Sequence, residues 1–234
     1  MAVDLLQRLQ DGPERIQREL LLQLVLGSAL IAVKGYAAPE TERAFTRARE
    51  LCERVGDPPE LFSALWGLWL MHLLRGELRT AYKLAERLLW LAQSAHDPAL
   101  LMYAQSALGS SSYWMGELLP AREHVEVAIP LYDRERHRLL TFRYGGAHAG
   151  TTCLLLAAAT LWRLGYLDQA VKRENEALAF AQGLSHPLSL AFTEFFVAIL
   201  RQSRREARAA QEAARGCDRT LCRARFSRLV GHGD

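Results

Sequence analysis

The side chains in this sequence that could do chemistry are histidines, cysteines and serines, and no phosphate-binding motif accompanies them. Nucleotide binding would need a glycine-rich loop followed by Lys, and the sequence contains no G-x-x-x-x-G-K-[ST] segment. Gly145, Gly146 and Gly150 form a glycine-rich segment, but no strand precedes it to present backbone amides to a phosphate. We therefore predict no nucleotide site and no cofactor.

Metal binding would need His, Cys or carboxylate ligands at set spacings. His124 follows Leu84 by one 40-residue step, at an apolar helix position, which favours a packed and hydrogen-bonded histidine over a metal ligand. Cys217, Cys222 and His232 contain no C-x-x-C pairing, so we expect free thiols and no metal.

Two histidines and a serine run remain as catalytic candidates. His137 and His148 lie on a long connection near Glu135, where solvent exposure is the usual state, and a helical hydrolase that uses one of them is the remaining enzyme alternative. Ser110–Ser112 lacks the G-x-S-x-G context that exposes a nucleophile. We predict that the chain is not an enzyme and has no catalytic residue.

The composition indicates which elements position these side chains. Among 234 residues, Leu and Ala supply 76 while Val and Ile supply 13, a ratio that favours helices over strands. The net charge is +3, and 26 Arg and 3 Lys are interspersed with 26 acidic residues, so we expect no nucleic-acid partner. The sequence predicts an all-α fold.

Cysteine use and hydropathy indicate the compartment. Four dispersed cysteines do not suggest a disulfide framework. The longest uncharged stretches, 98–116 and 144–162, are interrupted by polar residues, and the first residues do not form a basic and then apolar signal. We expect a cytoplasmic chain without membrane contact.

An internal repeat organises the chain. One phrase recurs at Gly76–Ala81, Gly116–Ala121 and Gly165–Ala170, with steps of 40 and 49 residues. Gly35 opens a looser first copy, and a fifth copy at Arg204–Ala209 lacks the glycine. The sequence thus contains about five units of roughly 40 residues.

Each unit is expected to form two helices. An apolar segment precedes each glycine, and an amphipathic segment with apolar residues at helical spacing follows it. The glycine supplies a tight turn that needs a left-handed backbone conformation. One helix hairpin cannot cover its own apolar face, so the units are predicted to stack as antiparallel helix pairs into a right-handed superhelix.

The unit resembles the tetratricopeptide repeat (TPR). When the turn glycines are aligned with that of the repeat, the position where its two helices cross holds a small residue in three units: Ser28, Gly109 and Ala158. The repeat's second small position also holds a small residue in three units: Ala81, Ala121 and Ala170. Trp69 departs from the pattern at the crossing position of the second unit. The 40-residue step exceeds the usual 34 residues, which implies longer helices.

Residues 5–210 also resemble the C-terminal helical array of large bacterial signalling ATPases. The likeness is carried by Lys34–Glu40, Ala48–Cys52, Leu65–Trp69, Leu131–Asp133, Tyr144–Gly146, Leu164–Ala170 and Leu184–Pro187. In that family a class III adenylate or guanylate cyclase domain and an AAA/STAND-type ATPase precede the repeats. The resemblance implies a non-catalytic scaffold or sensor module that acts in signal transduction and restrains the ATPase by binding a ligand or partner.

The inner surface of the superhelix is the predicted binding site. The repeat pattern directs aromatic, hydroxyl and basic side chains toward it: Ser63, Trp66, Tyr103, Ser106, Ser110, Tyr113, Trp162 and Arg163. Aromatic side chains with polar atoms are good anchors for a peptide or small effector. A stand-alone peptide-binding module is therefore the alternative function, and packing between repeats is the alternative role of these residues.

The end of the chain differs from the array. Ala207, Ala210 and Ala214 still stand at helical spacing, whereas residues 215–234 are basic and lack an apolar stripe. When residues 215–234 are written with permitted codons and read one nucleotide forward, the translation is an amphipathic segment that resembles the continuation of the same family. We predict a helical repeat domain at 1–214 and a tail at 215–234 that is frameshifted, poorly ordered and without function. The alternative is a genuine basic tail that binds nucleic acid.

Overall fold

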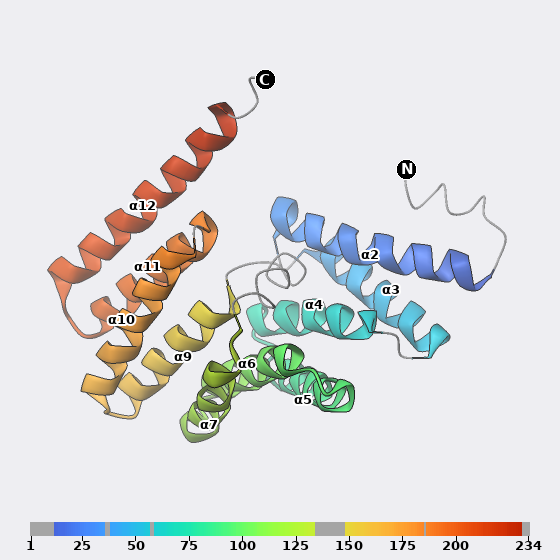
Figure 1. Ribbon diagram of the computed structural model, residues 1–234, viewed down its shortest axis with the longest axis horizontal. Helices are drawn as coiled ribbons and strands as arrows, with labels where there is room; N and C mark the ends of the chain where they lie inside the picture. The colour runs from blue at the N-terminus through green and yellow to red at the C-terminus, as the bar shows by residue number, and fades with distance from the viewer. Residues whose placement is uncertain (1–11, 36–37, 57–58, 134–147, 185, 231–234) are drawn as a thin grey trace.

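The computed structural model describes residues 12–35, 38–56, 59–133, 148–184 and 186–230, with side chains described through residue 222 except at residue 32. Within these ranges all regular structure is helical, and no strand is present (Figure 1). The helices are α2 (Pro13–Lys34), α3 (Pro39–Val55), α4 (Glu60–Leu74), α5 (Leu78–Ala95), α6 (Pro98–Met115), α7 (Leu118–Ala128), the 3₁₀ turn η1 (Ile129–Leu131), α9 (Ala149–Arg163), α10 (Leu167–Gly183), α11 (Pro187–Ser203) and α12 (Ala207–Val230). The predicted all-α class is confirmed.

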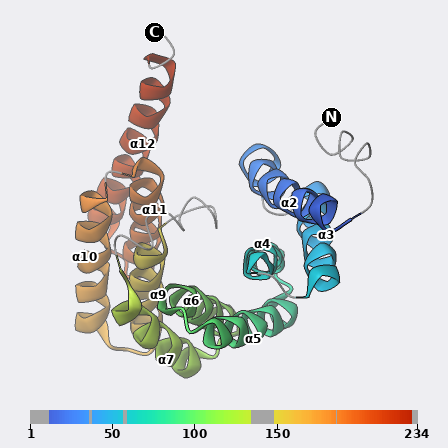
Figure 2. The ribbon, with the colours of Figure 1, turned by 45° about the vertical axis from the view of Figure 1, so that its right-hand side comes forward.

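The helices form antiparallel pairs that stack side by side: α2–α3, α4–α5, α6–α7, α9–α10 and α11–α12. Figure 2 shows that the pairs follow a curve, with α4, α6 and α9 on its inner side and α5, α7 and α10 on its outer side. The predicted superhelix of stacked helix pairs is confirmed, and the first helix of a pair lines the concave side as the repeat pattern requires.

The turn inside each pair uses a left-handed residue. Gly116 has a φ of 86°, and its amide bonds to the carbonyl oxygen of Tyr113 at 3.1 Å. Arg205 occupies the equivalent place in the last pair with a φ of 63°. The last pair therefore keeps the turn after losing the glycine, at the steric cost that a Cβ brings to this conformation.

Close approach of neighbouring helices depends on small residues. A Cβ added to Gly109 on α6 would lie 2.8 Å from Cγ1 of Val125 on α7, which agrees with the small residue expected at the crossing position. The ring of Phe45 on α3 lies between Gly27 and Gly67, since a Cβ on either glycine would come within 2.7 Å of that ring. Three consecutive helices thus meet at one aromatic side chain.

The core is concentrated in the middle of the array. Nine consecutive residues of α4, from Leu61 to Trp69, are buried, and so are eight consecutive residues of α6, from Ser106 to Tyr113. A helix that is buried on every side belongs to the interior of a protein. Trp69, at the position where the repeat has a small residue, is accommodated there and donates from Nε1 to Oγ of Ser111 at 3.0 Å.

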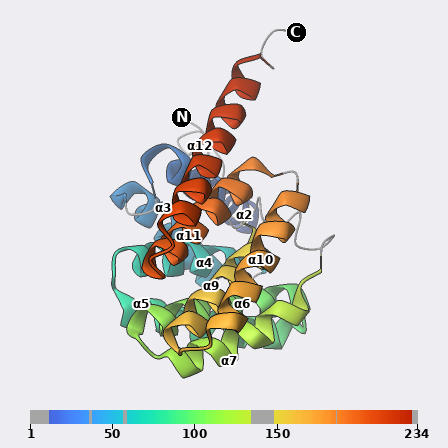
Figure 3. The ribbon, with the colours of Figure 1, turned by 90° about the vertical axis from the view of Figure 1, so that its left-hand side faces the viewer.

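The last element of the array is a single long helix. Helix α12 continues without a break from Ala207 to Val230 and extends past α10 and α11 (Figure 3). Its buried positions are Ala213 and Gly216, one residue away from the predicted Ala214. The Thr220 hydroxyl donates to Glu194 of α11 at 2.9 Å, so residues beyond 214 supply part of the contact with α11. The reading-frame origin of this segment stays a prediction.

Candidate functional site

Five of the eight predicted partner residues lie inside the array. Ser63 and Trp66 on α4, and Tyr103, Ser106 and Ser110 on α6, are all buried. The Trp66 ring centroid lies 4.5 Å from that of Trp69 and 5.1 Å from that of Tyr103, the latter edge to face. In this structure these side chains fill the core between α4 and α6, the packing role that the sequence left open.

The other three predicted residues lie where α6 and α9 end. Arg163, which is exposed, places its guanidinium carbon 4.4 Å from the ring centroid of Tyr113. Burial raises the pKa of the Tyr113 hydroxyl, and the positive charge of Arg163 opposes that rise. Trp162 is half-buried and lines a cavity. These three side chains lie near the turns inside the pairs, and they are buried at Tyr113, half-buried at Trp162 and exposed at Arg163.

Exposed apolar side chains surround this position. Trp114, Leu119, Tyr166 and Leu167 are 55%, 62%, 44% and 54% exposed, and all four flank the turns of the α6–α7 and α9–α10 pairs. The guanidinium carbon of Arg122 lies 4.9 Å from the Tyr166 ring centroid and joins the two turns. We call this group, Trp114, Leu119, Tyr166 and Leu167 with Arg122 and Arg163, the turn-edge surface.

Sequence reasoning did not single out the turn-edge surface, although the repeat contains a signal for it. Leu119 stands three residues after its turn glycine, where two other units have Arg79 and Asp168 and the first unit has Ala38. Tyr166 follows its glycine directly, as a tyrosine also does in the first unit, whereas the two units between them have glutamate. At Leu119, an apolar residue at a position that is charged in two sister units indicates a surface with a purpose beyond solubility.

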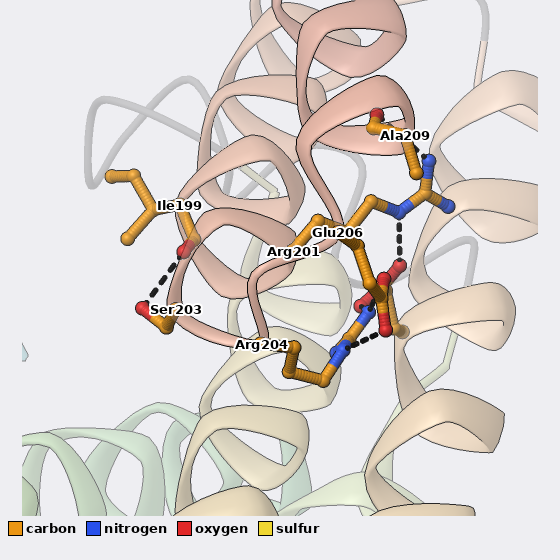
Figure 4. Close-up of polar contacts among 7 residues, drawn as sticks. Ile199, Arg201, Ser203, Arg204, Glu206 and Ala209 are labelled. Atoms are coloured by element: carbon orange, nitrogen blue, oxygen red, sulfur yellow. Dashed lines mark hydrogen bonds and ion pairs between the residues drawn. The ribbon is translucent and has the colours of Figure 1, made fainter.

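A charged network ties the last pair to the rest of the array. Glu174 on α10 is 1% exposed and accepts from Arg201 Nε at 2.7 Å, while Arg204 Nη2 lies 2.7 Å from its other oxygen. Arg204 also donates to both oxygens of Glu206, at 2.8 and 3.0 Å (Figure 4). The hydrogen bond from Arg204 lowers the pKa of Glu206.

A cavity of about 290 Å³ lies next to this network. It is lined by Trp162, Leu167, Asp168, Val171, Arg204 and Glu206. The lining thus combines one aromatic and two aliphatic side chains with two carboxylates and one guanidinium. Leu167 belongs to the turn-edge surface as well, so the cavity adjoins that surface.

The histidine candidates have packing roles where the structure describes them. His148 is buried, accepts from the amide of Gly150 at 3.2 Å as the N-cap of α9, and lies 5.3 Å from the Tyr132 ring. His124 pairs with Gln105 at 2.7 Å, and burial lowers its pKa. His137, Gly145, Gly146 and His232 lie outside the described residues.

The serines and cysteines show no activated nucleophile in the part of the chain that is described. Ser110, Ser111 and Ser112 are buried on α6, and the Ser111 hydroxyl donates to a backbone carbonyl. Burial raises the pKa of the Cys153 thiol to about 11, so it stays protonated near neutral pH. Among the described residues no group of three or more His, Cys, Asp or Glu could hold a metal ion.

Comparison with known proteins shows the fold. No protein-family model matches the chain. An uncharacterized protein of Rhizobium meliloti (strain 1021) is 21% identical over 192 residues, which cover 81% of this chain and 18% of that protein. Crystal structures of the nearly identical TPR-like repeats of a kinesin light chain-like protein from Podosopora anserina, one of them a Q17M variant, are similar with TM-scores of 0.58 and 0.60 and 14% identity. These likenesses cover 92% and 94% of this chain and 99% and 100% of the solved chains. The chain has a TPR-like helical-repeat fold.

Proposed function

We propose that the chain is a non-catalytic scaffold that binds a polypeptide partner through the turn-edge surface. The observation that carries the proposal is the exposure of Trp114, Leu119, Tyr166 and Leu167 on one edge of a TPR-like array. Aromatic and aliphatic side chains held by helix ends present apolar area with little freedom left to lose on binding. The predicted groove residues Trp66 and Tyr103 are buried in the structure, so the surface proposed here replaces them as the site to test.

A matched pair of variants tests the proposal. The double variant Trp114→Ser, Leu119→Ser removes apolar area from the turn-edge surface, whereas Trp90→Ser removes a 49% exposed tryptophan from α5. Purified wild type and variants, each immobilised, are incubated with lysate of the source cells, and the captured proteins are quantified by mass spectrometry. We expect a partner that binds wild type and Trp90→Ser and is lost, at least tenfold, from the double variant. Equal capture by all three proteins would contradict the proposed surface.

We propose further that the array belongs to the cyclase-linked signalling ATPases that its sequence motifs resemble. The motifs support this, and so does the size of the Rhizobium meliloti relative, of which the chain covers 18%. Sequencing the DNA on both sides of the coding region tests the proposal. We expect cyclase and ATPase domains encoded in frame upstream, and unrelated neighbouring genes would contradict it.

The non-catalytic part of the proposal has its own measurement. Among the described residues no group of three or more His, Cys, Asp or Glu could hold a metal ion, and burial keeps the Cys153 thiol protonated. We therefore expect the purified chain to hydrolyse ATP, or form cyclic nucleotides, no faster than a buffer blank. Turnover above the blank that co-purifies with the chain through two orthogonal columns would show an enzyme instead.

A further inference from the structure

The cavity beside the turn-edge surface has the size of a side-chain pocket. Its volume of about 290 Å³ lies just below the range of small-molecule sites, which starts near 300 Å³. Its apolar lining residues are Trp162, Leu167 and Val171, and its charged lining residues are Asp168, Glu206 and Arg204. Such a lining suits a long side chain that has an apolar stem and a polar head.

The charges select a cationic head. Arg204 is the only cation among the lining residues, and it is already bonded to both oxygens of Glu206 and paired with Glu174. Arg201 is likewise bonded to Glu174, and the Arg163 guanidinium lies over the Tyr113 ring. The Arg204–Glu206 pair compensates its own two charges, and Asp168 lines the cavity within the first turn of α10, so Asp168 leaves the lining with one net negative charge.

We propose that this cavity takes the lysine or arginine side chain of a polypeptide that lies along the turn-edge surface. Trp162 supplies an aromatic surface for the cation, Asp168 supplies the opposite charge, and Leu167 and Val171 contact the methylene stem. The polypeptide in this inference is the partner of the proposed function, whereas the cation preference rests on the cavity alone. The negative charge of Asp168 disfavours an acidic side chain.

The probe is N-acetyl-argininamide, with N-acetyl-citrullinamide as its neutral isostere. The full chain, labelled with ¹⁵N, is titrated with each compound while the indole N–H resonance of Trp162, assigned with Trp162→Phe, is followed. We expect saturable binding of the argininamide and at least tenfold weaker binding of the citrullinamide. Asp168→Asn should weaken the argininamide at least threefold, and the matched surface variant Asp218→Asn should leave it unchanged; circular dichroism checks that both variants stay folded.

Three outcomes would overturn the inference. They are equal binding of the two compounds, tighter binding of an acidic analogue (the α-amide of N-acetyl-glutamic acid), and no effect of Asp168→Asn. The result separates the two proposals. If the argininamide does not bind while a partner still depends on Trp114 and Leu119, the cavity assignment fails and the proposed function stands. If the argininamide binds but no polypeptide depends on the turn-edge surface, the proposed function fails and the cation preference of the cavity stands.

Discussion

The middle of the array and its C-terminal pair are held together by different forces. In the middle, α4–α7 bury large apolar side chains completely, among them Leu88, Met102 and Leu108. At the C-terminal end, α11 and α12 share a smaller apolar cluster and depend on Glu174, which is buried with two arginines. Removing a few buried apolar atoms lowers the free energy of unfolding in proportion to the apolar area lost. Removing one partner of a buried ion pair leaves an unpaired buried charge, which is strongly destabilising. We therefore expect the array to unfold locally from its C-terminal pair.

Replacing Glu174 gives the sharpest test of this contrast. Glu174→Ala leaves Arg201 and partly buried Arg204 without their shared carboxylate, and breaking such a buried pair costs about 3–5 kcal/mol. Hydrogen exchange should show faster exchange in α11 and α12, with α4–α7 unchanged. Glu176→Ala, on the same helix in a half-exposed pair with Arg173, should cost about 1 kcal/mol or less. Uniformly faster exchange along the chain would refute the local picture.

Truncation of a core side chain in the middle tests the other half of the comparison. Met102 is fully buried on α6, and Met102→Ala should lower the free energy of unfolding by about 2–5 kcal/mol through lost burial and a new cavity. Since each pair contacts its neighbours, urea denaturation followed by circular dichroism should shift as a whole. The 48% exposed Val127 is the control, and Val127→Ala should change stability by about 0.5 kcal/mol or less.

Substitutions at two turn residues should change stability by smaller amounts and in opposite directions. Arg205 in the last pair is left-handed, so Arg205→Gly should relieve backbone strain and raise stability by up to about 1 kcal/mol. Gly116 in the middle has no heavy atom within 4 Å of an added Cβ, so Gly116→Ala should cost about 1–2 kcal/mol from the backbone alone. Thermal unfolding measures both. A destabilised Arg205→Gly would mean that the arginine side chain contributes more than its strain costs.

Mild acid should loosen the C-terminal pair, with the smallest effect of the four. Burial lowers the pKa of His186, whose Nδ1 accepts from the Ser189 amide at 3.3 Å as the N-cap of α11. Because the folded pKa lies below the ordinary value of 6.5, the contribution is complete above pH 6.5 and is lost as the pH falls through the folded pKa. The protection factors of the α11 amides, which are the intrinsic exchange rate divided by the observed rate, should therefore fall between pH 7 and 5.5. His186→Asn keeps a capping group that does not titrate, and its exchange should follow the intrinsic pH dependence alone.

The candidate site could be predicted only in part. Tyr113, Trp162 and Arg163 were among the predicted residues and lie beside the turn-edge surface, whereas Trp66 and Tyr103 lie in the core. A repeat pattern states which side of a helix faces the concave surface, but it does not state how much of that surface other parts of the chain cover. The apolar residue at Leu119 was readable by comparison with Arg79 and Asp168 in the sister units.

The sequence by itself determined the helical class, the paired helices and the place of each turn, because composition, 3.6-residue periodicity and left-handed glycines act within one or two turns of chain. Tertiary structure decided the rest. Arg205 keeps a glycine-type turn because α11 and α12 pack against each other around it, and Glu174 stays buried because two arginines from α11 and its turn reach it. Contacts between residues 27 or more positions apart depend on the stacking of whole helices, which no local pattern specifies.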